Sequence, residues 1–83
     1  MIRLLYFAWV RERIGAAEES LALAGPMPLA VLLGELAARS EGHAAALAES
    51  QRLRFAINQE FAGPEAVVHP GDEVALFPPV TGG

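Results

Sequence analysis

The sequence contains no cysteine and no lysine, and each absence removes several classes of function. Without cysteine there is no disulfide, cysteine-ligated zinc site, iron–sulfur cluster or thiol nucleophile. Because all 6 basic side chains are arginine, a Walker phosphate-binding loop, a Schiff base and a lysine general base are excluded as well. The lack of cysteine fits a reducing cytoplasm, which is the location we expect.

Charge and hydropathy indicate which classes of partner the protein can bind. The net charge is −4 and the pI is about 5.0, so we expect no nucleic-acid partner, because such domains carry a basic stripe. No apolar run reaches the roughly 18–20 residues that span a bilayer. Residues 1–15 contain three arginines and no small-residue cleavage site, so we expect neither a signal peptide nor a membrane partner. The mean hydropathy of +0.33 instead favours a surface for a protein partner.

Periodicity along the 83 residues predicts one α+β domain. Apolar residues at helical spacing follow Pro28 and predict a main helix that ends at Gly42, with an optional short helix over 43–51. Arg11-Glu12-Arg13 reads as a solvated loop or as an ion-pairing rim for a partner, and Phe61 leads into irregular sequence. The residues His69-Pro70-Gly71-Asp72 predict a type II turn. Alternating or aromatic and branched segments predict strands at residues 2–9, 19–23, 53–57 and 73–77.

This order predicts a mixed sheet with one main helix packed on one face, and with the first and last strands as parallel neighbours in its middle. We expect one hydrophobic cluster between helix and sheet. Its predicted members are Ile2, Leu4, Tyr6, Leu21, Leu23, Leu29, Leu32, Leu33, Leu36, Leu53, Phe55, Ile57, Val74 and Leu76.

The body of the chain offers little chemistry. The acidic pairs Glu18-Glu19 and Asp72-Glu73 are neighbours on strands, so their side chains point to opposite faces and read as solvated charges. His43 and His69 lie far apart without metal-ligand spacing, so we expect no metal site.

The C-terminus differs from the rest of the chain. Its last seven residues are Phe77-Pro78-Pro79-Val80-Thr81-Gly82-Gly83. Two glycines allow the backbone to enter a narrow channel, and two prolines lower the entropy cost of holding the segment extended. A terminal carboxylate can be activated for acyl chemistry without a catalytic side chain of its own, although a frayed tail is the simpler interpretation.

The ending, residues 71–83, resembles the small subunit of molybdopterin synthase (molybdopterin-converting factor subunit 1), a ubiquitin-like sulfur-carrier family. The segments Tyr6–Glu12 and Ile57–Glu60 are similar to that family as well. The resemblance implies a ubiquitin-like β-grasp domain over residues 1–83, with 78–83 as a protruding Gly-Gly tail.

The resemblance also implies a role in molybdenum cofactor biosynthesis. An adenylating, E1-like activating enzyme would use ATP on the carboxylate of Gly83, and a sulfur donor protein would supply the sulfur of the resulting thiocarboxylate. Gly82 would allow the tail to thread into the large synthase subunit, where sulfur passes to cyclic pyranopterin monophosphate in a heterotetramer. The chain alone would bind no cofactor and would not be a catalyst.

Two other interpretations stay open. One is a sulfur carrier for thiazole synthesis, tRNA thiolation or protein conjugation. The other is a β-grasp binding module whose Gly-Gly is incidental.

Strand parity predicts the partner surface. Alternation puts Leu5, Phe7, Ala75 and Phe77 on the sheet face away from the helix, with Arg54 on the same face. Exposed aromatic side chains are common binding hot spots. The predicted partner-binding residues are Leu5, Phe7, Arg11, Arg54, Ala75, Phe77, Pro78, Pro79, Val80 and Thr81.

Overall fold

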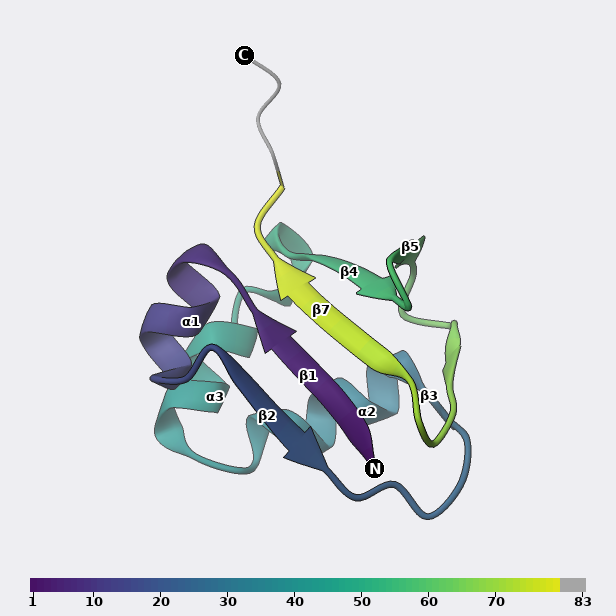
Figure 1. Ribbon diagram of the computed structural model, residues 1–83. Helices are drawn as coiled ribbons and strands as arrows, with labels where there is room; N and C mark the ends of the chain where they lie inside the picture. The colour runs from purple at the N-terminus through teal and green to yellow at the C-terminus, as the bar shows by residue number, and fades with distance from the viewer. Residues whose placement is uncertain (80–83) are drawn as a thin grey trace.

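The computed structural model describes residues 1–79, which form a mixed five-stranded sheet and a helical layer (Figure 1). The strand order is β2-β1-β7-β4-β5. The expected pairing is confirmed, because β1 (Ile2–Tyr6) runs parallel to β7 (Glu73–Phe77) near the middle of the sheet. The other main-sheet strands pair antiparallel, and they are β2 (Glu18–Leu21), β4 (Arg54–Ile57) and β5 (Glu60–Ala62).

A second, two-stranded sheet pairs β3 (Met27–Pro28) with β6 (Val67–Val68). The helices are α1 (Ala8–Ile14), α2 (Leu29–Ala37) and α3 (Glu41–Leu47), and a short 3₁₀ helix, η1, covers Ser50–Arg52. Figure 1 shows α2 and α3 behind one face of the sheet, with α1 beside the end of β1. Among residues 1–79, no helix covers the opposite face.

The first strand is shorter than predicted, and the expected loop after it is a helix. β1 ends at Tyr6, and α1 begins at Ala8. The predictions of a strand over 2–9 and of a loop at Arg11–Arg13 were therefore wrong. Val10 is fully buried and Ile14, four residues later, packs against the core. This spacing forms one apolar helix side. Gly15 ends α1 in the left-handed conformation, with φ 89°, as glycine does without steric cost.

The main helix also ends earlier than predicted. The structure ends α2 at Ala37 and begins α3 at Glu41, so Gly42 lies inside α3 and is no helix terminator. A Cβ on Gly42 would lie 2.5 Å from the carbonyl oxygen of Arg13. Glycine is therefore required at this position, because the backbone of α1 occupies the space that a side chain on α3 would need.

The two turns near β7 have different outcomes. The type II turn is confirmed, because Gly71 has φ 95° and the Asp72 N–H donates to the His69 carbonyl at 3.0 Å. The segment from Phe61 was read as irregular, whereas Glu60–Ala62 forms β5 in a hairpin with β4. Asn58 and Gln59 take φ of 52° and 70° at that turn, which matches a two-residue hairpin loop.

The core lies between the sheet and the helices, as predicted. Of the expected members, Leu21, Leu33 and Ile57 are only partly buried at its edge, and the others are buried. Val10, Ala46, Leu47 and Val68 also belong to the cluster. Within residues 1–79 no helix is long and apolar enough to cross a membrane. The same residues contain no group of three metal-ligating side chains that could hold an ion.

Candidate docking face and tail root

The helix-free side of the sheet, here called the outer face, collects the predicted partner residues. Leu5 pairs with Ala75 across β1 and β7, and Arg54 pairs with Phe77 across β4 and β7. Paired residues point to the same side of a sheet. Four of the predicted residues are therefore brought together by register alone.

Phe7 extends this row beyond β1. Its N–H donates to the Leu76 carbonyl at 3.2 Å, so the backbone still follows β7 although Phe7 caps α1. Its side chain is 49% exposed. Arg11 is exposed on α1 and lies outside the strand register that joins the other residues.

Phe61 is an outer-face residue that the sequence analysis missed. It pairs with Ala56 on β5, and it is 83% exposed. Its ring centroid lies 6.0 Å from that of Phe77, a spacing typical of interacting aromatic rings. The alternation of Glu60-Phe61-Ala62 after a polar turn was the signal that could have found it.

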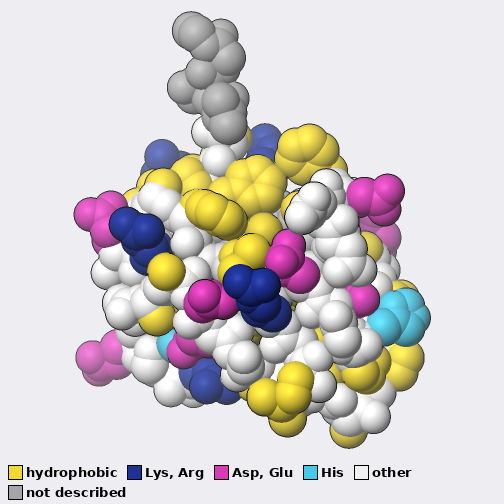
Figure 2. All heavy atoms as spheres, viewed as in Figure 1, with side chains coloured by type: hydrophobic (Ala, Val, Ile, Leu, Met, Phe, Trp, Pro, Cys, Tyr) yellow, Lys and Arg dark blue, Asp and Glu magenta, His cyan; other side chains and the backbone are white. Residues whose placement is uncertain are grey.

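The outer face is divided into an apolar end and a charged end. In Figure 2, hydrophobic side chains gather close to the end of β7, with basic side chains at the edge of this area, and side chains of both charges lie farther from it. Arg3 marks the charged end, with Glu18 at 2.8 Å and Glu73 at 3.8 Å. These hydrogen-bonded charges hold β1 against β2 and β7, and they raise the pKa of Arg3 above its usual range.

The tail begins at the apolar end. Pro78 is half-buried and Pro79 is exposed directly after β7. The remaining predicted site residues, Val80, Thr81, Gly82 and Gly83, lie outside the described residues. The apolar end of the outer face is therefore the surface from which the tail departs.

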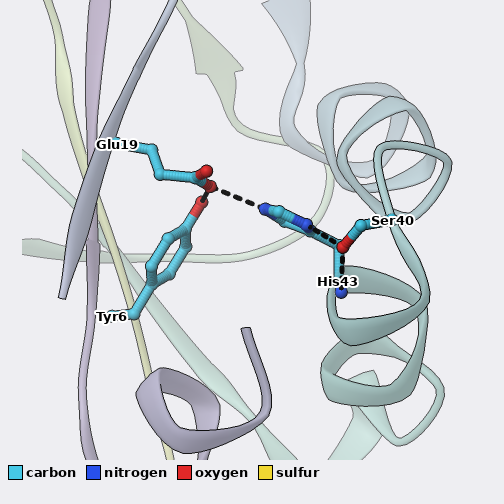
Figure 3. Close-up of polar contacts among 4 residues, drawn as sticks. All are labelled: Tyr6, Glu19, Ser40 and His43. Carbon is cyan, nitrogen blue, oxygen red and sulfur yellow. Dashed lines mark hydrogen bonds and ion pairs between the residues drawn. The ribbon is translucent and has the colours of Figure 1, made fainter. Parts of the chain in front are cut away.

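A polar network on the helical side was also missed (Figure 3). The Tyr6 hydroxyl donates to Glu19 Oε1 at 2.7 Å, and His43 Nε2 lies 2.6 Å from the same oxygen. Ser40 Oγ lies 2.7 Å from His43 Nδ1 and accepts the His43 backbone N–H as the cap of α3. The interpretation of Glu19 as a solvated charge was wrong, because Glu19 joins β2 to α3.

The network shifts the protonation of two of its members. Burial raises the pKa of Tyr6 far above its usual value, and the Glu19 carboxylate adds to this. Burial alone would raise the pKa of Glu19, but hydrogen bonds from His43 and Tyr6 outweigh it and hold that pKa below 4.5. His43 is buried beside both groups. The arrangement ties α3 to the sheet.

Comparison with known proteins decides the family. The model of the ThiS family matches residues 4–83. The chain belongs to the ThiS family. The molybdopterin synthase sulfur carrier subunit of Escherichia coli is 42% identical over 83 residues, covering 100% of both chains.

Two solved structures share the fold. A putative molybdopterin converting factor, subunit 1, from Pyrococcus furiosus has a TM-score of 0.79 at 25% identity, covering 95% of this chain and 97% of that one. The small archaeal modifier protein 1 of H. volcanii has a TM-score of 0.74 at 27% identity, covering 95% and 97%. The expectation of a ubiquitin-like β-grasp fold is confirmed.

Proposed function

We propose that this ThiS-family protein is the sulfur carrier subunit of molybdopterin synthase. The observation that carries the proposal is the 42% identity to the Escherichia coli carrier over the full length of both chains. The structure supports it, because an apolar face without a helix adjoins the root of a Gly-Gly tail. The chain has no lysine or cysteine, which agrees with a carrier whose partners supply the acid, base and nucleotide-binding groups.

The proposed chemistry takes place on the carboxylate of Gly83. An activating enzyme joins this carboxylate to AMP from ATP and releases pyrophosphate, which makes the carbonyl carbon electrophilic. The terminal sulfur of a persulfide on the donor protein then displaces AMP and forms an acyl disulfide. A second thiol cleaves the S–S bond, which leaves a thiocarboxylate on Gly83 and a disulfide on the donor side. ATP binds the activating enzyme in this scheme, and the carrier itself holds no cofactor.

The proposed partner for sulfur delivery is the large subunit of the synthase. The tail enters this subunit, with Gly82 allowing close backbone approach, and the thiocarboxylate gives its sulfur to cyclic pyranopterin monophosphate. The outer-face residues Leu5, Phe7, Ala75 and Phe77 dock the body of the carrier. Arg11 and Arg54 are placed at the rim of that interface, and the proposed setting is the cytoplasm.

The tail provides the direct test. Deleting Gly83 removes the reacting carboxylate, and adding one residue after it converts that carboxylate into a peptide amide, while β7 stays intact. We expect both variants to melt like the wild type and to lose thiocarboxylate formation, measured by intact mass after incubation with activating enzyme, ATP and sulfur donor. An extended variant that still transfers sulfur to the pterin precursor would contradict the proposal.

The likeness to small archaeal modifier protein 1 favours one alternative, protein modification through the same activated carboxylate. Reconstitution separates the two functions. The carrier function requires molybdopterin to form from the thiocarboxylated chain, large subunit and pterin precursor. Covalent attachment of Gly83 to lysines of other proteins, without molybdopterin formation, would instead support modification.

A further inference from the structure

A groove of about 930 Å³ lies where β7 and β5 end and β4 begins. Its lining is mostly apolar and includes Leu33, Phe55 and Phe61. It continues from the outer face around the edge of the sheet toward the middle of α2. The groove was not predicted, because about a third of its lining residues come from the segment after Glu60, which was read as irregular.

The groove adjoins the tail. Phe77 and Pro79 both line it, and Pro79 is the last described residue before Val80–Gly83. A protein that accepts those four residues into a channel must therefore lie against this end of the sheet. Phe61 and Phe77 are shared by the groove and the outer face, so one partner can cover both without a gap.

The groove also has a cation at its rim. Arg54 lines it and is exposed, and its side chain donates to the Leu53 carbonyl at 3.1 Å. Within residues 1–79 no carboxylate lies within ion-pair distance of Arg54, whereas the nearby Arg52 is paired with Glu49 at 3.4 Å. A partner carboxylate would complete this site.

We propose that the groove is a second docking site for the large synthase subunit, which adjoins the flat outer face at Phe61 and Phe77. It receives a large apolar side chain, leucine or aromatic, from a segment that carries a carboxylate beside it for Arg54. Such anchor-in-pocket contacts concentrate binding energy near the centre of an interface. This inference rests on the proposed function, because it takes the large subunit as the protein that accepts the tail.

The absence of cysteine makes a footprint experiment direct. Ser50→Cys places a single thiol in the groove by a nearly isosteric change, and Ala45→Cys places one on the exposed surface of α3 as a control. Alkylation of each thiol is timed with and without saturating large subunit. We expect the complex to slow alkylation at Ser50→Cys by about tenfold or more, since interface cores exclude water, and to leave Ala45→Cys unchanged.

A filling variant tests whether the contact contributes to affinity. Ser50→Trp occupies the groove, and Ala45→Trp is the matched control. We expect Ser50→Trp to weaken binding to the large subunit by about tenfold or more, as loss of an anchor does, with a circular dichroism spectrum like the wild type. Arg54→Gln is expected to reduce the salt dependence of binding.

The outcomes separate this inference from the proposed function. A wild-type chain that forms no complex with the large subunit would contradict the proposed function. A wild-type complex in which Ser50→Cys reacts at the free rate would overturn the groove inference alone, whatever the effect of Ser50→Trp on folding. Protection of Ser50→Cys by excess carrier without large subunit would assign the groove to self-association and overturn it as well.

Discussion

At the scale of single residues, a substitution at Phe7 is expected to affect partner binding more than the stability of the fold. Its side chain is 49% exposed beside Phe77 and away from the core. We expect Phe7→Ala to weaken binding to the large subunit by about 1–2 kcal/mol or more, in the range of interface hot spots, with a smaller loss of thermal stability. Calorimetric titration and a thermal melt of the same variant measure the two effects.

Val31 offers the matched control for Phe7. It is a similarly exposed apolar residue, at 51%, but it lies on α2 in the helical layer. Val31→Ala is expected to leave binding unchanged. Equal affinity of Phe7→Ala and the wild type would remove the outer face from the docking surface, while the groove would be judged by its own variants.

At the scale of elements, α3 is held to the sheet by the polar network, and this link depends on pH. The folded state lowers the pKa of Glu19, so its stabilising contribution is present above the unfolded value near 4.5 and is lost as pH falls through the lower, folded value. Glu19→Gln is expected to lower the free energy of unfolding by about 1–3 kcal/mol at neutral pH, because the buried side chains of Tyr6 and His43 lose a charged hydrogen-bond partner.

Urea unfolding from neutral to acidic pH measures this effect. Glu19→Gln should reduce the loss of stability that occurs as the pH falls. Part of that loss should remain, because the pKa values of Asp72 and Glu49 are also lowered in the fold. The charge of Arg39 also helps to lower the pKa of Glu19. Glu12→Gln, on the exposed surface of α1, is the control. Parallel profiles for Glu19→Gln and the wild type would show that the network does not contribute to acid stability.

The elements also show which predictions a sequence can support. β7 was predicted with its observed limits, because Pro78 cannot donate to the strand ladder and the turn at Gly71 has a distinct sequence. The outer-face row followed from strand alternation once β1 and β7 were placed side by side. α1 was missed because Tyr6–Trp9 is aromatic and apolar, so local propensity favoured a strand and tertiary burial of Val10 decided for a helix.

The missed parts of the site depend on contacts between distant segments. Glu19 meets His43 across 24 positions of sequence, and no local pattern indicates that meeting. Ser40 caps α3 by accepting the His43 N–H, but such a local motif does not specify which residue lies opposite. Phe61 became part of the docking face only because β5 pairs with β4.

At the scale of the whole molecule, surface area limits how many partners the carrier binds at once. Its accessible surface is 4844 Å², and a standard interface takes about 800 Å² from each partner. The outer face with the tail root is one such area, and both proposed partners need the same Gly83. We therefore expect the activating enzyme and the large subunit to compete rather than to form a ternary complex.

Competition can be measured on the wild-type chain. Saturating large subunit should slow adenylation of the carrier, followed as ATP–pyrophosphate exchange by the activating enzyme, and excess carrier should restore the rate. Phe7→Ala should weaken both associations, because the same apolar row serves both. A stable complex of all three proteins in size-exclusion chromatography, with undiminished exchange, would show that the two partners use different surfaces. The carrier would then pass between them without dissociating.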